Sequence, residues 1–234
     1  MMRLQVALAH AGCASRRKCA RFIKEGRVRV NGKVITEPGF KIDISKDRIT
    51  HSGKKILLQD KTYLLLNKPK DVITSVSDTH ARKTVLDLIP KNRHRLYPVG
   101  RLDKDTTGLL LITNDGELAF RLTHPKFEVE RVYEVAVKGE PSNADMKKLE
   151  KGIYLEGRRT ASCKIEILKR SLKKSLLRIS LHEGRKRQIR NMFKKVGYPV
   201  TQLKRIKFGP LELRGLKTGE YRNLKGYEIE SLLL

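Results

Sequence analysis

The 234-residue sequence predicts an α+β protein in two parts: a small module of helices and a hairpin at residues 1–60, and a larger domain with a mixed, mainly antiparallel sheet at residues 61–234. Two observations support this prediction. Short amphipathic helices and an Asn-Gly turn crowd the first sixty residues, whereas longer apolar strands begin near residue 61. Strands and helices then alternate in irregular order, which favours an α+β sheet over a doubly wound one.

The first part is built from short elements that end at glycines. Apolar residues recur at helical spacing from Leu4 to Ala11, and Gly12 ends that predicted helix. Ser15 is a suitable N-cap for a second helix, which ends near Gly26. Asn31-Gly32 then predicts a tight hairpin. The second helix places Cys19, Phe22 and Ile23 on one face and basic side chains on the other.

The net charge of +27 indicates a polyanionic partner. Residues 1–60 alone hold 14 basic and 5 acidic side chains. Nucleic acid is the expected partner, because phosphates bind Lys and Arg with counterion release. A membrane span is excluded, since no apolar stretch approaches the ~20 residues required. A solvated basic helix is the plainer interpretation of one such face, but two adjacent basic elements favour RNA contacts by Arg16, Arg17, Lys18, Arg21, Lys24, Arg27 and Arg29.

The second part begins with longer elements whose ends are marked by turn residues. A buried strand at 62–67 stops at Lys68-Pro69, and a second strand at 108–113 closes at a turn of Asn, Asp and Gly. The pattern then predicts, in order, a helix at about 117–124, an alternating strand at 129–137, a hairpin of 163–168 with 175–182, and a helix at 189–196 that ends at Gly197.

Several kinds of chemistry are excluded because their residues are missing. The chain has no P-loop, no glycine-rich dinucleotide loop and no G-x-S-x-G elbow. Its six histidines are scattered, and its three cysteines have no metal spacing, which suits a reducing cytosol. We therefore expect no metal and no cofactor, and an enzyme built on this chain would use carboxylates, tyrosine and arginine.

The polar loop between Tyr97 and Gly108 is the strongest candidate for a site. It leads directly into a hydrophobic strand, so its side chains lie at the edge of a sheet, where sites commonly form. From the residues alone, Asp103 and Asp105 are both more often turn or cap residues, and Arg101 is more often a surface charge. The spacing does not choose between the two acids.

The segment G-R-L-D-x-x-T-x-G-L-L-L-x-T-x-D-G at residues 100–116 resembles the catalytic motif of the pseudouridine synthases, in particular the RsuA/RluB group that modifies ribosomal RNA. Companion motifs follow at Asn67-Lys68-Pro69, Tyr133, residues 183–190 and residues 204–211. Arg131 stands where this group usually has Lys, and keeps its charge. Residues 2–50 resemble the RNA-binding domain named after ribosomal protein S-four.

This resemblance implies roles for particular residues. Asp103 supplies the catalytic carboxylate, held ionised by an ion pair with Arg190, and acts either by covalent attack or in a glycal route. Tyr133 stacks on the target base, and Arg101 helps to extrude the uridine from the RNA. Ile189 and Leu211 form an apolar wall, and Lys68 binds phosphate or supports the loop. Further RNA contacts are expected from Arg185, Arg187, Lys204 and Arg205, since residues 163–208 carry 15 basic and 2 acidic side chains.

The sequence thus predicts a site-specific RNA pseudouridine synthase. Residues 115–133 look more like the enzymes of the large ribosomal subunit than those of the small one. The alternatives are a small-subunit synthase, an inactive synthase core that serves as a ribosome-assembly RNA-binding protein, and another sugar or nucleotide enzyme, which the charge disfavours. The expected partner is ribosomal RNA or an assembling subunit, and we expect a cytoplasmic monomer that does not bind membranes.

Overall fold

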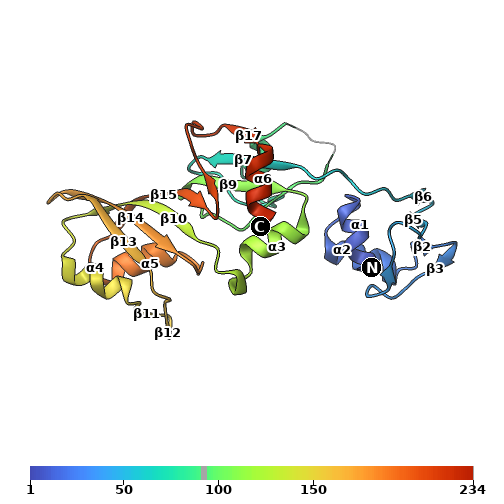
Figure 1. Cartoon of the computed structure of the whole chain (residues 1–234), viewed down its shortest axis with the longest axis horizontal. Coiled ribbons are helices and arrows are strands. Elements are labelled where there is room, and N and C mark those ends of the chain that lie inside the picture. Colours follow the sequence, from blue (N-terminus) through green and yellow to red (C-terminus); the bar gives the residue numbers. More distant parts are fainter. Residues whose placement is uncertain (91–93, 234) are drawn as a thin grey trace. The chain divides into compact units, whose positions relative to one another are not determined.

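The computed structural model describes residues 1–90 and 94–233, and the chain divides into two compact units (Figure 1). The first comprises Met1–Thr62 with 94–96 and Asn114–Gly116, and the second comprises the other described residues. Each unit has its own hydrophobic core, so each is described by itself. None of the helices in the described ranges has the length and apolar character needed to cross a membrane.

The first unit packs two helices against short strands. Helix α1 spans Leu4–His10 and α2 spans Arg16–Lys24, with the predicted cap formed by the Ser15 hydroxyl, which accepts from the Lys18 amide at 3.3 Å. A four-stranded sheet has the order β3-β2-β5-β6, and β1 pairs separately with β4. The strand bounds are β1 Met2–Arg3, β2 Val28–Val30, β3 Lys33–Val34, β4 Lys41–Ile42, β5 Ile49–His51 and β6 Lys54–Lys55.

The core and the hairpin of this unit follow the sequence pattern. Cys19, Phe22 and Ile23 are buried together with the apolar face of α1. Asn31 and Gly32 join β2 to β3 with φ angles of 50° and 82°, the paired positive values of a type I′ hairpin turn. The predicted helix face and the predicted hairpin are both present.

The second unit is built on a nine-stranded sheet whose main path runs β13-β14-β10-β15-β9-β7-β17. Strand β16 pairs with β15 and β8 with β9. The β15–β9 contact is parallel and the other pairs are antiparallel, so the sheet is mixed. Its strands are β7 Tyr63–Lys68, β8 Tyr97–Pro98, β9 Thr107–Thr113, β10 Arg131–Lys138, β13 Lys164–Lys169, β14 Lys174–Leu181, β15 Val200–Phe208, β16 Leu211–Glu212 and β17 Tyr221–Asn223.

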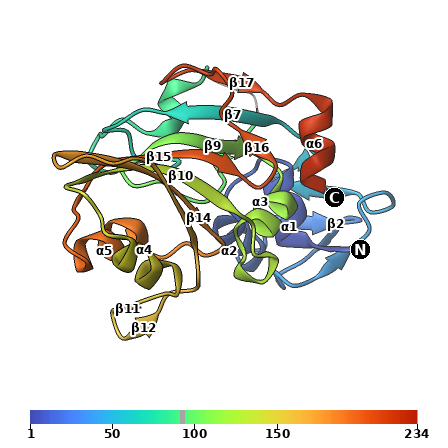
Figure 2. The same ribbon diagram turned by 60° about the vertical axis from the view of Figure 1, so that its left-hand side comes forward.

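Helices cover this sheet in two groups, and each group has its own core. Helices α3 (Gly116–Thr123) and α6 (Gly226–Leu233) pack on the part around β7 and β9. Helices α4 (Asn143–Glu150) and α5 (Gln188–Lys195) lie side by side against the part around β10 and β14 (Figures 1 and 2). The remaining elements are the short helices η1 Val85–Leu88 and η2 Pro125–Phe127 and the ribbon of β11 Tyr154–Leu155 with β12 Arg158–Arg159.

The predicted α+β class is confirmed, and the strands and helices predicted from periodicity lie within a few residues of their expected places. Strand β15 was not predicted, although it is the link between the two cores: it supplies Phe208 to one and Leu203 to the other. Helices α4 and α6 were also not predicted. All three cysteines are free thiols, two of them partly exposed and Cys19 buried.

Candidate active site

The polar loop predicted as the site connects β8 to β9 and is held by hydrogen bonds to its backbone carbonyls. The Thr106 amide donates to the Asp103 carbonyl at 3.0 Å, and the Thr74 hydroxyl donates to the Leu102 carbonyl at 2.7 Å. Gly108 follows, where β9 and β15 run parallel. A Cβ at this position would lie 2.2 Å from the Arg205 carbonyl oxygen, and φ is +104°. Only glycine permits this approach, which explains the glycine of the motif.

Lys68 lies beneath the same loop and is fully buried. Its ammonium donates to the carbonyls of Pro69, Asp103, Lys104 and Thr106 at 2.8–3.3 Å. Burial lowers its pKa to about 8, against the opposing attraction of nearby aspartates. A direct phosphate contact by Lys68, one of its two expected roles, is incompatible with this burial, so its position favours support of the loop.

A cavity of about 240 Å³ opens beside the loop, somewhat smaller than the roughly 300–1,000 Å³ of pockets for drug-sized ligands. Of the residues predicted for catalysis and base extrusion, Asp103, Tyr133 and Arg101 all line it. Ile189 also lines the cavity. Other lining residues had no expected role: Thr106, Glu183, Lys186, Gln188 and Phe208 lie within the motif segments, whereas Thr123, Leu181 and Leu203 lie outside them.

Arg190 does not pair with Asp103, and this corrects the expected ion pair. The Nη2 atom of Arg190 lies 3.2 Å from the Asp105 carboxylate and donates to the Asp105 carbonyl at 3.0 Å. Arg187 binds the same carboxylate through both Nη atoms at 3.2–3.3 Å. Within residues 1–90 and 94–233, the Asp103 carboxylate forms no ion pair. The two acids of the loop therefore have different surroundings, a difference that the spacing did not resolve.

The charges around Asp105 determine its ionisation. Burial alone would raise its pKa, but the Arg187 hydrogen bond and the charges of Arg190 and Arg187 outweigh burial and hold the pKa of the carboxyl below its usual value. Asp105 is consequently a stable anion that keeps two arginines at the side of the loop. Arg187 itself adopts a left-handed backbone (φ +51°) directly before α5, an uncommon conformation for a non-glycine residue.

The opposite wall of the cavity comes from β10 and β15. Tyr133 pairs with Arg205 across these strands, next to a shift in register between Val132 and Tyr133. Such irregularities redirect side chains and occur often beside active sites. Arg205, predicted as a surface RNA contact, is instead buried: its Nε donates to the Leu109 carbonyl at 2.8 Å, and its guanidinium lies 4.6 Å from the centre of the Phe208 ring.

Arg131 occupies the position at which the resembling group usually has lysine, and its guanidinium is bound within the fold. It donates to the carbonyls of Val129, His182 and Leu122 at 3.0–3.3 Å. Burial lowers its pKa, and the neighbouring Arg205 acts in the same direction while Tyr133 opposes it. Arg131 also lines the cavity, so this residue links the site to the turn between α3 and β10.

Three other predicted residues lie away from their expected places. Leu211 is fully buried in the core around β7 and β9, where it pairs with Phe208, and does not line the cavity. Arg185 lines the cavity, but its guanidinium is held by Glu183 at 3.1 Å and by the carbonyls of Arg158 and Arg159. Lys204 faces the other side of the sheet, because side chains alternate along a strand.

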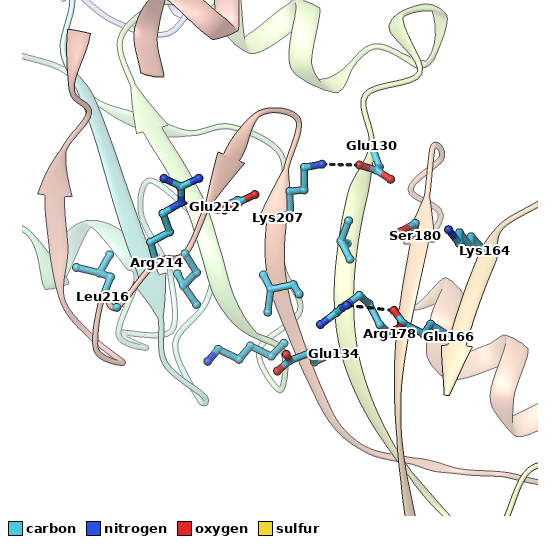
Figure 3. Close-up of a pocket in the computed structure, with 15 residues that line it drawn as sticks. Glu130, Glu134, Lys164, Glu166, Arg178, Ser180, Lys207, Glu212, Arg214 and Leu216 are labelled. Atoms are coloured by element: carbon cyan, nitrogen blue, oxygen red, sulfur yellow. Dashed lines mark hydrogen bonds and ion pairs between the residues drawn. The ribbon is translucent and has the colours of Figure 1, made fainter. Parts of the chain in front are cut away.

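That other side of the sheet holds a larger cavity of about 740 Å³ (Figure 3). Glu134 and Lys204 line it, whereas their strand neighbours Tyr133 and Arg205 line the smaller one. Its charges are largely matched in pairs, such as Lys207 with Glu130 at 2.9 Å (Figure 3). The loop with the motif aspartates does not reach it. The smaller cavity, where a carboxylate, a tyrosine and an arginine meet, is therefore the candidate active site.

The basic residues predicted for RNA contact in the first unit form an exposed face. All seven are exposed: Arg16, Arg17, Lys18, Arg21, Lys24, Arg27 and Arg29. Phe22 supports this face from below, with the Arg27 guanidinium 4.6 Å and the Lys18 ammonium 5.8 Å from its ring centre.

Over residues 1–90 and 94–233, no group of three or more His, Cys, Asp or Glu side chains could hold a metal ion.

Comparison with known proteins places both units in families. The model of the RNA pseudouridylate synthase family matches residues 62–195, and that of the S4 domain matches residues 2–49. A ribosomal large subunit pseudouridine synthase B of Bacillus subtilis (strain 168) is 48% identical over 234 residues, covering 99% of this chain and 96% of that protein. An uncharacterized RNA pseudouridine synthase of Aquifex aeolicus (strain VF5) is 40% identical over 232 residues, covering 99% and 93%.

A solved structure agrees with these matches. The crystal structure of a pseudouridylate synthase superposes with a TM-score of 0.72 at 30% identity, covering 99% of this chain and 100% of that one. The resemblance of the loop motif and the resemblance of residues 2–50 are both confirmed.

Proposed function

Because the chain belongs to the RNA pseudouridylate synthase family, we propose that it isomerises a specific uridine in large-subunit ribosomal RNA. The family makes the chain an RNA pseudouridine synthase, an isomerase. The choice of the large subunit is supported by the Bacillus subtilis relative, whose name states that target.

The observation that carries the proposal is the position of the Asp103 carboxylate. It lines the smaller cavity together with Tyr133 and Arg101, and no cation of the described chain is bound to it. In the reaction the bond between N1 of uracil and C1′ of ribose breaks, the base turns, and C5 bonds to C1′. The proton on C5 leaves and N1 gains one, so the isomerisation requires one carboxylate and no redox change.

We assign the surrounding residues by their geometry. Tyr133 stacks on the uracil ring and Ile189 packs against it, while exposed Arg101 at the cavity takes the place that the flipped nucleotide leaves in the RNA. Arg190 supports the site through Asp105 rather than by pairing with Asp103. We assign Leu211 to support of the apolar wall and Lys68 to support of the loop, since both are buried and neither lines the cavity.

We assign residues 1–60 to docking on structured RNA and residues 61–234 to catalysis. The exposed basic face of the first unit supports the docking role, since phosphate contacts supply affinity and orientation without determining chemistry. The proposed substrate is ribosomal RNA, free or in an assembling subunit, and the enzyme acts as a monomer in the cytoplasm.

The test is a pseudouridine map of both ribosomal RNAs, by chemical labelling and primer extension, from cells with and without the gene. We expect one large-subunit signal to disappear, to return with the wild-type gene and not to return with Asp103→Asn. The Asn variant should still bind RNA with nearly unchanged affinity. Loss of a small-subunit signal would overturn the target, and full activity of Asp103→Asn would overturn the catalytic assignment.

A further inference from the structure

Three aromatic side chains lie exposed together on α3 and η2. Phe120 is 49% exposed and Phe127 is 38% exposed, and His124 between them is exposed as well. The ring centres of Phe120 and His124 are 4.7 Å apart, and those of Phe120 and Phe127 are 6.0 Å apart with the planes at 88°. Large apolar rings that gather in this way on a surface commonly mark a place of binding.

The aromatic cluster adjoins the candidate active-site cavity. Thr123, the residue before His124, lines that cavity. The turn that carries the cluster is held on both sides by Arg131, which donates to the carbonyls of Leu122 and Val129 and itself lines the cavity. The cluster is consequently fixed at the rim of the site and does not lie on a free loop.

A cation accompanies the rings. The Lys126 ammonium lies 4.6 Å from the ring centre of Phe127 and 5.7 Å from that of Phe120. Exposed aromatic faces beside a flexible basic side chain are the combination with which proteins bind single-stranded nucleic acid: bases stack on the rings and phosphates take the cation. The helix α3 is anchored by its buried side chains Leu118 and Leu122. The exposed rings of the cluster are therefore not needed to hold the helix in place.

We propose that Phe120, His124 and Phe127 form a stacking platform for an unpaired RNA base that neighbours the flipped uridine, with Lys126 binding its phosphate. The inference rests on the proposed function only in that the ligand is RNA. A flipped uridine leaves its neighbours without a stacking partner, so a platform at the cavity rim would lower the cost of extrusion by receiving one of them.

The first experiment measures affinity for transcripts of the large-subunit and small-subunit ribosomal RNAs. The variants are Phe120→Leu, Phe127→Leu and the double variant, in which apolar volume remains but the ring face is lost. We expect the dissociation constant of the double variant to rise about 5- to 150-fold, the range that loss of base stacking gives. The single-turnover rate at saturating enzyme should also fall, by no more than the same factor, because extrusion of the uridine becomes more costly while no reacting group is removed.

Tyr227→Leu is the matched control. This ring is also exposed in the second unit, also has a lysine ammonium 6.0 Å from its centre, and does not line the cavity. Its removal should leave affinity unchanged. Lys126→Gln should lower the dependence of binding on salt by about one phosphate contact while keeping most of the stacking.

Ultraviolet crosslinking of the wild-type complex with mass spectrometry gives an independent readout, with a nucleotide expected on Phe120 or Phe127. Unchanged affinity in the double variant, or an affinity loss matched by a lower melting temperature, would overturn the platform. Binding of a protein partner without an effect on RNA would also overturn it. If cells without the gene keep every pseudouridine of both ribosomal RNAs, the proposed function fails, whereas the affinity ratios and crosslinks still decide this inference.

Discussion

At the scale of single residues, two aspartates of one loop have different surroundings. Asp105 binds Arg187 and Arg190 and is kept ionised by them, whereas the Asp103 carboxylate is left to the cavity. As proposed above, the Asp103 carboxylate, which lines the cavity together with Tyr133, is the reacting group, and Asp105 with its two arginines is its support. Two acids that lie only two residues apart in the motif therefore differ in their partners within the fold.

Asp105→Asn should weaken the support of both arginines without removing the reacting group. We expect the single-turnover rate to fall about 10- to 100-fold, since small displacements in an active site have effects of this size. RNA affinity should change little. Rapid-quench measurement of pseudouridine formation checks this, with Asp71→Asn, an exposed acid 3.8 Å from Lys104, as the control. Full activity of Asp105→Asn would remove the supporting role.

Lys68→Met should lower the free energy of unfolding by about 2–4 kcal/mol. The change removes the ammonium shared by the carbonyls of Asp103, Lys104 and Thr106 in the loop and by that of Pro69, and loss of a buried, charged hydrogen-bond donor is costly. Urea denaturation followed by circular dichroism measures this loss. Lys104→Met, in which an exposed lysine of the same loop is changed, should alter stability by less than about 0.5 kcal/mol. Equal effects of the two variants would contradict the buried role.

Lys68 should also make stability depend on pH. Its pKa is about 8 in the folded protein and 10.5 in its usual state, so between these values the unfolded chain binds more protons than the folded one. The free energy of unfolding should therefore rise with pH across this window and reach its full gain near pH 10.5. Lys68→Met should lack this rise. The difference between the two proteins in urea titrations from pH 7 to 10.5 isolates the contribution, and parallel curves would refute it.

At the scale of elements, the sequence predicts those whose apolar residues have a single period. Strand β9 and helix α5 are of this kind, and both were predicted within about a residue. Strand β15 was not, because it has a different environment on each face: Arg205 is buried beside the active site, while Lys204 lines the second cavity. Because basic residues lie on both faces of β15, its sequence lacks the alternation of apolar and polar residues that would predict a strand. Helix α4 had a usable signal in its capping pair, Ser142 and Asp145.

The site was predictable in the same uneven way. Asp103, Tyr133 and Arg101 come together because the motifs lie at strand ends and on one strand face. The partner of Arg190 was not predictable, since the choice between Asp103 and Asp105 depends on how α5 meets the loop in three dimensions. Leu211 illustrates the same limit, because one step along a strand moves a side chain from a cavity wall into a core.

Gly108→Ala should disrupt the parallel contact between β9 and β15. The new Cβ would collide with the Arg205 carbonyl, and the φ of +104° is unfavourable for any other residue. We expect stability to fall by about 3 kcal/mol and activity to be lost with it. Gly226→Ala is the control, because nothing lies within 4 Å of its Cβ position and its φ is not in the left-handed region. Thermal unfolding of the two variants compares them, and similar melting temperatures would contradict the steric argument.

At the scale of the whole molecule, both parts of the chain are basic: residues 1–60 contribute +9 and residues 61–234 contribute +18 to the net charge of +27. The first unit holds the exposed basic face of α2, and the second holds the loop and its cavity. A net charge of +27 gives strong, salt-sensitive attraction to RNA, which steers binding without selecting a base. The choice of uridine is left to the fit of RNA shape around the cavity.

Replacing Arg17, Lys18 and Arg21 together by Gln should weaken RNA binding through its electrostatic part. The slope of log affinity against log salt should fall by about 2–3, as expected for the loss of three phosphate contacts. The single-turnover rate at saturating enzyme should remain near that of the wild type. Lys41→Gln with Lys46→Gln, two exposed lysines outside α2, is the control. Filter binding at several salt concentrations measures the slopes, and equal slopes would contradict an RNA contact by α2.

The parallel contact at Gly108 also determines the order in which the protein can mature during translation. Arg205 donates to the Leu109 carbonyl across 96 residues of chain, so the wall of the cavity is incomplete until β15 has left the ribosome. The first unit holds its own core within the first sixty or so residues and can fold much earlier. The proposed docking role of the first unit would thus be available in the nascent chain long before the proposed catalytic role of the second.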